Sequence, residues 1–484
     1  MSALSLLMLA SCALKIAPIP PAPIDAQPLI APINWDDAGR EVADVLSAYI
    51  QTPTVNPPGN ELAGAEYLGS VLEAEGIPYE IVESAPGRGN LIARLDSDVD
   101  EVRPLCLMSH IDVVTYDVDS WTRPPLSGDI QDGYVWGRGA LDMKSLGAIE
   151  MMTMVWLKRL NIPLKRDIIL LAVADEEVDN SGAKYIADNK WGEIGCSQMI
   201  NEGGIGLEDL LFDGQTVFPI SVGEKGSLWA RMVATGEPGH GSTPRPDSEA
   251  PAHLMAALER LNGRKIEVKV HDAFYELLSL AGQDKGGATG FILQRPFLVN
   301  TVVRPTLLKN PLTRAGMIDT VHLTGLGTTG ENEPNVVASE VYAILDCRTM
   351  PDTTPAAHLA YIKTIAGPGV DFEVISSRQG NYSAWQGDPL YEAIARQVEA
   401  RGAVPGPVIS VGFTDSILFR PLGVTAYGFM PFIVTQKDME GFHGDDERIS
   451  IDNLRRGLQM MVNVVLEVSA TGAAPTVAVE DVLP

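Results

Sequence analysis

Short apolar runs alternate with segments of helical spacing along most of this chain. Pro104–Ser109 and Asp167–Ala174 read as buried strands, and Lys144–Leu160 lies between them with the spacing of a helix. Alternation of this kind is typical of a mainly parallel sheet that carries helices on both faces. The fold class that we expect is therefore α/β.

Polar residues follow three of the expected strands. His110, Glu176 and Glu202 each come just past such a run, the last one after Gln198–Ile200. In open α/β sheets, ligands bind at the carboxyl ends of the strands. This pattern predicts that the three side chains share one site at that edge.

The texture of the sequence divides the chain into four segments. From about Val222 alternating strand runs replace the α/β pattern, which returns after Pro351 and implies an insertion. We expect a signal-like and Pro-rich segment at residues 1–34 and a first catalytic part at 35–221. An inserted α+β lid or dimerisation domain would follow at 222–350, and a second catalytic part at 351–484. The region from Val270 to Pro311 reads as less regular.

The first residues resemble a bacterial lipoprotein signal. Leu9-Ala10-Ser11-Cys12 resembles a cleavage box, although the usual basic start is missing, and an apolar N-terminus with a chance cysteine is the alternative. A lipid anchor on Cys12 would make the protein a periplasmic or membrane-anchored lipoprotein. Without the anchor a cytoplasmic location is the alternative.

Charge and cysteine usage narrow the classes of function. The 36 Lys and Arg against 63 Asp and Glu give a net charge of −27, which repels phosphate backbones and argues against a nucleic acid partner. The four cysteines show no C-x-x-C pair and no disulfide-rich spacing, so no disulfide framework is expected.

Imidazoles and carboxylates converge at the expected strand ends. Two histidines and three carboxylates, which suit zinc, are too few for two separate closed sites unless one carboxylate is shared. The ligand candidates are His110, Asp142, Glu202, His443 and one of the adjacent pair Glu176 and Glu177. Each has an ordinary reading in isolation, as a structural histidine, a helix-start acid or a solvated loop residue; their joint occurrence favours a metal site.

Taken together, these segments resemble the metallopeptidase family that includes glutamate carboxypeptidase, aminoacylase, desuccinylase and carnosinase. The run from Trp121 to Gly139 is most similar to the carboxypeptidase S-like branch. The resemblance implies a zinc-exopeptidase-like catalytic domain and two zinc ions, for which cobalt or manganese may substitute. His110 and Glu202 would bind one ion, Glu177 and His443 the other, and Asp142 both.

The resemblance also assigns residues around the metals. It implies that Asp112 orients His110 and that Glu176 is the general base, a choice that spacing alone cannot make between Glu176 and Glu177. His240 would stabilise the oxyanion, in relatives often from the partner subunit of a homodimer. A glycine-flanked turn histidine is the ordinary reading of His240.

Four further residues are candidates for binding substrate. Arg348 could form a bidentate contact with a carboxylate, or else be a structural arginine paired to an acid. Asn335, Gly412 and Thr414 match substrate-contacting positions of the resembled family, but Phe413 is larger than usual there.

The expected activity is hydrolysis of an amide bond next to a free C-terminal carboxylate, in a small peptide or an N-acyl amino acid. A glutamate at the Glu202 position goes with carboxypeptidases and deacylases in the resembled family. A dipeptidase, a non-catalytic metal-binding relative and a two-metal phosphohydrolase are the alternatives. The resemblance further predicts a cis peptide bond at Asp142–Met143.

Overall fold

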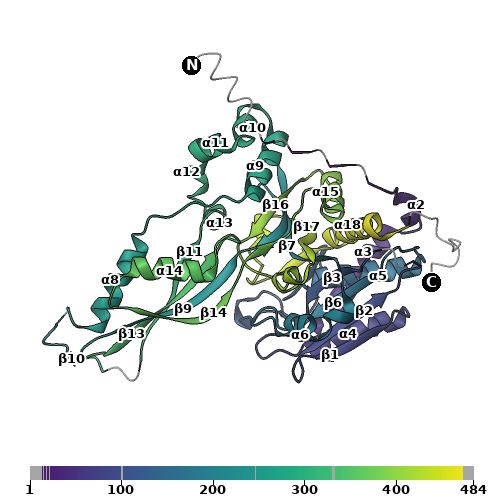
Figure 1. Cartoon of the computed structure of the whole chain (residues 1–484). Coiled ribbons are helices and arrows are strands. Elements are labelled where there is room, and N and C mark those ends of the chain that lie inside the picture. Colours follow the sequence, from purple (N-terminus) through teal and green to yellow (C-terminus); the bar gives the residue numbers. More distant parts are fainter. Residues whose placement is uncertain are drawn as a thin grey trace, which may run out of the picture.

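The computed structural model of the chain describes residues 14, 16–17, 19–20, 22–99, 102–245, 247–329 and 333–471. Two sheets of different size organise it (Figure 1). Cys12, with the expected cleavage box, lies outside the described residues. None of the helices in these ranges is long and apolar enough to cross a bilayer.

The larger sheet has nine strands and a parallel centre. β6, β3, β7 and β17 run parallel to one another. On one side β2 is antiparallel to β6 and β1 to β2; on the other side β8 is antiparallel to β7 and β17, β15 is antiparallel to β8, and β16 pairs in parallel with β8. The strands, in their order across the sheet, are β1 (Tyr79–Glu83), β2 (Gly89–Leu95), β6 (Ile168–Val173), β3 (Leu105–His110), β7 (Gln198–Glu208), β17 (Thr425–Val434), β8 (Thr216–Glu224) and β15 (Asn381–Tyr382), with β16 (Val404–Ser410) on β8.

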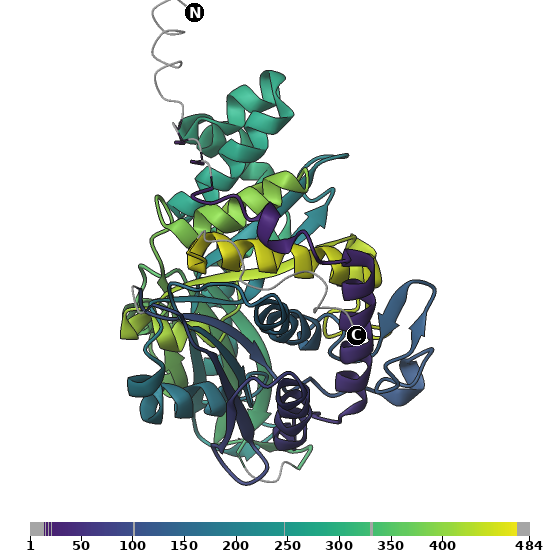
Figure 2. The same ribbon diagram turned by 90° about the vertical axis from the view of Figure 1, so that its right-hand side faces the viewer.

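Helices cover both faces of this sheet, as the sequence predicts. Along β3, Leu105 and Leu107 face one core, whereas Cys106 and Met108 face the other, because successive side chains of a strand point to opposite faces. The first core is closed by α3 (Trp35–Gln51), α4 (Glu61–Ala74), α5 (Lys144–Arg159), α15 (Pro389–Ala400) and α18 (Ile451–Ser469), and the second by α6 (Ser181–Asn189), α7 (Trp191–Ile194) and α16 (Ser416–Phe419). Figure 2 shows these two helix layers on either side of the strands.

The smaller sheet is antiparallel and carries helices on one face. Its strands are β11 (Thr320–Thr328), β13 (Glu340–Thr349), β9 (Gly226–Thr235) and β14 (Asp371–Arg378), and α8 (Ala250–Asn262) and α14 (Pro355–Ala366) pack on it. This sheet extends past the boundary expected at residue 350, because β14 hydrogen-bonds to β9. We refer to it as the lid sheet.

The region from Val270 to Pro311, which reads as irregular in the sequence, is largely helical. Gly286, Gly287 and Pro296 interrupt its periodicity and divide it into short helices. These are α9 (Asp272–Lys285), α10 (Gly287–Leu293), α11 (Pro296–Leu298), the π-helical turn η2 (Val299–Val303), α12 (Arg304–Leu307) and α13 (Pro311–Ala315). α9 packs against β16 at the edge of the large sheet.

Smaller elements complete the fold. β18 (Arg448–Ser450), β5 (Tyr134–Trp136) and β4 (Ile130–Gln131) form a three-stranded sheet, and β10 (Gly239–His240) pairs with β12 (Val336–Val337). The short helices are α2 (Gln27–Ile30), η1 (Val118–Ser120), η3 (Arg420–Leu422) and α17 (Gln436–Met439).

One disulfide bond joins Cys106 of β3 to Cys196, which precedes β7. The spacing of the cysteines did not reveal it, because the two residues are 90 positions apart and only strand pairing brings them together. Cys347 is buried and free. The expectation of no disulfide framework therefore needs this correction.

Candidate active site

The acidic and imidazole side chains expected at the strand ends do converge. His110 is the last residue of β3, and its Nε2 lies 3.4 Å from Oδ1 of Asp142. One ligand atom each from His110, Asp142 and Glu177 lies within 4.8 Å of the others. The peptide bond between Asp142 and Met143 is cis, which confirms the prediction for it.

His443 reaches the same carboxylates from the far end of the chain. Its Nε2 lies 2.7 Å from Oδ2 of Asp142 and 3.3 Å from Oε2 of Glu177. Asp142 thus stands between the two imidazoles, with one oxygen toward each. The imidazole of His443 is 50% exposed, whereas His110 is buried, so the cluster runs from the core to the surface.

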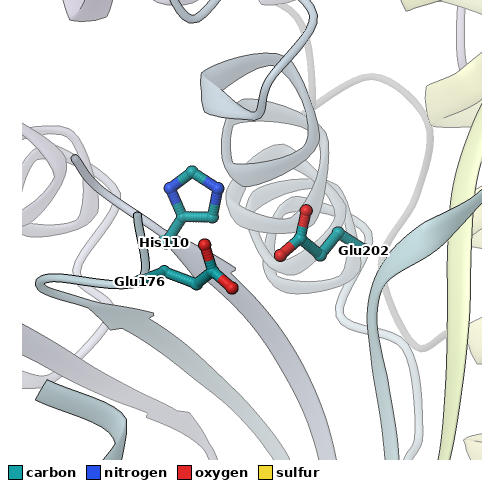
Figure 3. Close-up of side chains that lie close together, drawn as sticks. All are labelled: His110, Glu176 and Glu202. Atoms are coloured by element: carbon teal, nitrogen blue, oxygen red, sulfur yellow. The ribbon is translucent and has the colours of Figure 1, made fainter. Parts of the chain in front are cut away.

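A second group forms on the other side of His110. Ligand atoms of His110, Glu176 and Glu202 also lie within 4.8 Å of one another. Figure 3 shows the two carboxylates turned toward the space beside the imidazole, Glu176 from the segment after β6 and Glu202 from β7. His110 therefore belongs to both groups.

Glu202 does not lie past the end of its strand, as the sequence suggested, but inside β7. Asn201 pairs with Gly428, and the next paired residue of β7 is Ile205, opposite Met430. The residues between Asn201 and Ile205 therefore form a bulge, and bulges re-aim side chains at functional sites. Gly203 has φ +116°, which a residue with a side chain adopts only under strain.

Asp112 holds the cluster from behind. Its Oδ1 accepts the backbone N–H of Glu176 and its Oδ2 that of Glu177, both at 3.1 Å. Nδ1 of His110 lies 2.9 Å from the backbone oxygen of Asp112 and 3.6 Å from Oδ1. Asp112 therefore contacts His110, for which the sequence predicted an orienting partner, and also the backbone of both glutamates.

Glu447 was missed by the sequence analysis. Its carboxylate is buried and accepts the backbone N–H groups of Gly139, Leu141 and Asp142 at 2.9, 2.6 and 2.8 Å, and Arg138 Nη1 lies 2.7 Å from it. Glu447 thereby fixes the turn that presents Asp142. No local motif marks it, because the turn that it supports lies more than 300 positions earlier in the chain.

The cluster gathers several carboxyl groups in a largely buried site. Burial raises the pKa of Glu202 well above its usual range, and Asp142 and Glu177 raise it further. Burial and the carboxylate of Glu202 likewise raise the pKa of Glu176. Hydrogen bonds to Asp142 and Glu177 raise the pKa of His443 to about 10. The site attracts positive charge.

These side chains fit a metal centre. Oδ1 of Asp142 and Oε1 of Glu177 are buried without a hydrogen-bond partner. Buried carboxylate oxygens are normally hydrogen-bonded or coordinated to a cation, because stripping them of water is costly. Carboxylates and imidazoles in this proportion are ligands that zinc accepts.

A cavity of about 490 Å³ opens beside the cluster. Asp142, Glu176, Glu177, Glu202 and His443 form one part of its wall. Most of the remaining wall is apolar, with Leu207, Leu210, Leu211, Pro219, Phe274, Leu277, Leu312, Val408, Ile409, Met430, Met439 and Phe442. The ionisable cluster is therefore one part of a mainly apolar wall, in which His271, Thr313, Ser410 and Thr414 are the other polar side chains.

The expected glycine-rich loop also borders the cavity. Gly412, Phe413 and Thr414 line it. Thr414 is buried, and its hydroxyl donates to Oε1 of Glu224 at 3.0 Å. Phe413 thus occupies the pocket wall where the resembled family has a small residue.

Arg348 is already paired in this structure. Its Nε and Nη2 donate to the two oxygens of Asp346 at 2.8 and 3.0 Å, which matches the structural alternative for this residue. Arg378, at the end of β14, was not singled out from the sequence. Its Nη1 donates to Oδ1 of Asn180 at 2.8 Å, and both guanidinium groups lie close to the ring of Phe413, at 5.4 Å for Arg348 and 4.9 Å for Arg378.

His240 and Asn335 lie together but apart from the cluster. Nδ2 of Asn335 is 3.4 Å from Nε2 of His240, and both residues are exposed. His240 lies in β10, and Asn335 directly precedes β12; these two strands form a small ribbon at the tip of the lid sheet, remote from the large sheet (Figure 1). Within one chain, the structure does not bring these two residues to the cavity.

Known proteins share this sequence pattern. The model of peptidase family M20/M25/M40 matches residues 106–467. The human N-fatty-acyl-amino acid synthase/hydrolase PM20D1 is 28% identical over 84% of this chain and 84% of its own. The probable carboxypeptidase S-like 2 of Dictyostelium discoideum is 27% identical over 74% of this chain and 70% of its own.

A solved structure shares the fold. The M20 family metallo-carboxypeptidase Sso-CP2 from Sulfolobus solfataricus superposes with a TM-score of 0.67 at 19% identity, covering 88% of this chain and 98% of that one. The family match includes His110, Glu176, Glu202 and His443. This chain belongs to peptidase family M20/M25/M40, and it is a metal-dependent hydrolase of amide bonds.

Proposed function

We propose that the chain hydrolyses N-acyl amino acids with an extended apolar acyl group and a free carboxylate. The observation that carries the proposal is the junction of an ionisable cluster with an apolar chamber of about 490 Å³. An amide bond beside the cluster would leave the acyl chain among leucines and phenylalanines. The similarity to the human N-fatty-acyl-amino acid synthase/hydrolase supports this choice of acyl group.

We assign the metal ligands as the sequence suggests. His110 and Glu202 would hold one zinc ion, Glu177 and His443 the second, and Asp142 both, with cobalt or manganese as substitutes. Bound ions of this kind lower the pKa of water toward ~7 and polarise a carbonyl oxygen. The unpartnered oxygens of Asp142 and Glu177 support this assignment.

Glu176 would serve as the general base and then the general acid. It stands beside His110 and Glu202, and Asp112 holds its backbone. Its raised pKa, which burial causes, favours a carboxyl group that takes a proton from water and returns it to the leaving amine.

Arg378 is our candidate for binding the carboxylate of the substrate. No carboxylate among the described residues forms an ion pair with it, whereas Arg348 is engaged by Asp346. Both guanidinium groups flank Phe413, which lines the cavity. A planar guanidinium can make two parallel hydrogen bonds to a carboxylate.

His240 would complete the site from a second copy of the chain. Its distance from the cluster within one chain supports a homodimer, and so do the exposed apolar residues Leu326, Val374 and Ile375 of the lid sheet. Gly412, Thr414 and Asn335 would contact the substrate. The disulfide bond supports an oxidising location such as the periplasm, whether or not Cys12 is lipidated.

The test compares substrates and metals. Zinc-loaded protein is assayed with N-lauroyl and N-acetyl amino acids, dipeptides, and N-lauroyl amino acid amides, before and after chelation. We expect the N-lauroyl amino acids to give the highest kcat/KM. Chelation should abolish the activity, and added zinc should restore it. Preference for dipeptides would support a dipeptidase instead, and full activity of chelated protein would refute the metal assignment.

A further inference from the structure

One segment has a charge that is opposite to the rest of the chain. Residues 285–318 contain five Lys and Arg and none of the 63 Asp and Glu, although the net charge is −27. These residues form α10, α11, η2, α12 and α13, which we call the basic cap. α10, α11 and α12 project from one end of the molecule, whereas α13 lies below them in Figure 1; teal helices project from the same end in Figure 2.

The basic cap exposes large apolar side chains beside these charges. Phe291, Phe297, Val302 and Leu312 are 44%, 60%, 56% and 53% exposed. Phe297 and Val302 are about one turn apart on the continuous run of α11 and η2, because residues four to five apart in such turns are neighbours. Exposed aromatic residues next to basic ones are typical of segments that lie on a membrane surface.

Three cations of the basic cap have no acidic partner in the part of the chain that the structure describes. No carboxylate of the described residues forms an ion pair with Arg304, Lys309 or Arg314. Lys309 and Arg314 are exposed, and Lys285 lies over the ring of Phe212 at 5.3 Å. These cations are available to an external anionic partner.

The basic cap lies next to the cavity and next to the N-terminal segment of the chain. Leu312 and Thr313 of α13, with Phe274 and Leu277 of α9, line the apolar cavity, so the basic cap lies at its rim. The backbone N–H of Leu14 donates to the carbonyl of Gln294 at 2.8 Å. The chain therefore enters the fold at the basic cap, two residues after Cys12 in the sequence.

We propose that the basic cap docks on an anionic phospholipid surface. The basic side chains would contact lipid headgroups, and Phe297 and Val302 would enter the acyl boundary. A second copy is a poor occupant, because two like-charged caps would repel each other. Docking would bring the rim of the cavity to the lipid bilayer, where acylated molecules concentrate. The docking proposal does not depend on the proposed hydrolysis.

Vesicle flotation tests the proposal. The full chain carrying Cys12→Ser, which removes any lipid, is mixed with vesicles of phosphatidylcholine alone or with phosphatidylglycerol added. We expect binding to the anionic vesicles, weakened by salt because headgroup contacts are screened. Lys309→Glu with Arg314→Glu should lower the affinity at least tenfold, and Phe297→Ser with Val302→Ser should do so even at low salt.

Matched controls separate docking from folding and catalysis. Lys158→Glu with Lys184→Glu makes the same charge change at exposed residues of α5 and α6 and should leave binding unchanged. All variants should keep the melting temperature and the turnover of a water-soluble substrate. Absence of binding to anionic vesicles, or equal losses in the control and the cap variants, would overturn the proposal, while failure of hydrolysis alone would not.

Discussion

Nδ2 of Asn335 lies 3.4 Å from Nε2 of His240 at the tip of the lid sheet, away from the acidic cluster. Two residues that were both expected at the substrate therefore lie together, away from the cavity of their own chain. We predict that Glu176→Gln and His240→Ala are each nearly inactive and that their mixture regains activity. Random exchange of subunits gives about a quarter of the wild-type rate, because half of the dimers are mixed and each has one intact site.

Size-exclusion chromatography provides the control for this experiment. The wild type and both variants should elute as dimers. If the mixture stays as inactive as its components while subunits exchange, His240 does not act across a dimer.

Glu176→Gln should lower kcat by about 10²–10⁴-fold, because the amide cannot accept the proton of water. Zinc content, measured by mass spectrometry, and melting temperature should stay at wild-type values. Glu66→Gln removes an exposed acid of α4 and serves as the matched control. A loss of bound zinc in Glu176→Gln would instead make Glu176 a metal ligand.

Arg378→Lys should raise KM for N-acyl amino acids by about 10–100-fold, because a lysine cannot reproduce the paired hydrogen bonds of a guanidinium. The substitution Arg348→Lys should raise KM by a smaller factor, because the guanidinium of Arg348 is held by Asp346. Steady-state kinetics with free and amidated substrates provide the measurement. Equal losses on both substrates would show that Arg378 does not bind the carboxylate.

Glu150 gives a prediction about stability. It is buried in α5, and burial raises its pKa well above the usual range. A raised pKa means that the folded state binds this proton more tightly, so stability falls as the pH rises from the unfolded pKa toward the folded one. The melting temperature of Glu150→Gln should therefore exceed that of the wild type, and the difference should grow from pH 5 to pH 9. A difference that does not change with pH would contradict this prediction.

The disulfide bond should be worth about 2–5 kcal/mol, because it closes a loop of 90 residues in the unfolded chain. Replacing Cys106 and Cys196 by alanine should lower the urea midpoint, and a reductant should do the same to the wild type only. Cys347→Ala, which removes a buried free thiol, measures the cost of lost packing. An unchanged midpoint in the double variant would refute the estimate.

The parts of this protein that depend on local pattern were predictable. Apolar runs mark β3 and β6 because both are buried on both faces, and the residues that follow them, His110 and Glu176, come together as expected. The cis bond at Asp142–Met143 followed from family resemblance.

The parts that depend on distant pairing were not predictable. Glu447 acts on a turn far away in the sequence, and Arg378 meets Phe413 only because β14 joins β9. The pairing of β7 with β17 continues that strand past Glu202, which a local reading ends at Asn201. In each case the information lies in tertiary contacts and not in the neighbouring residues.

The order of strands in the large sheet has a consequence for how the protein is made. β17 sits between β7 and β8, yet the ribosome synthesises it more than 200 residues after both, and His443 later still. Until β17 has been synthesised, its position between β7 and β8 is unfilled, and all strands of the lid sheet are synthesised during that time. The cluster around Asp142 and Glu177 is therefore complete only after His443 has been synthesised.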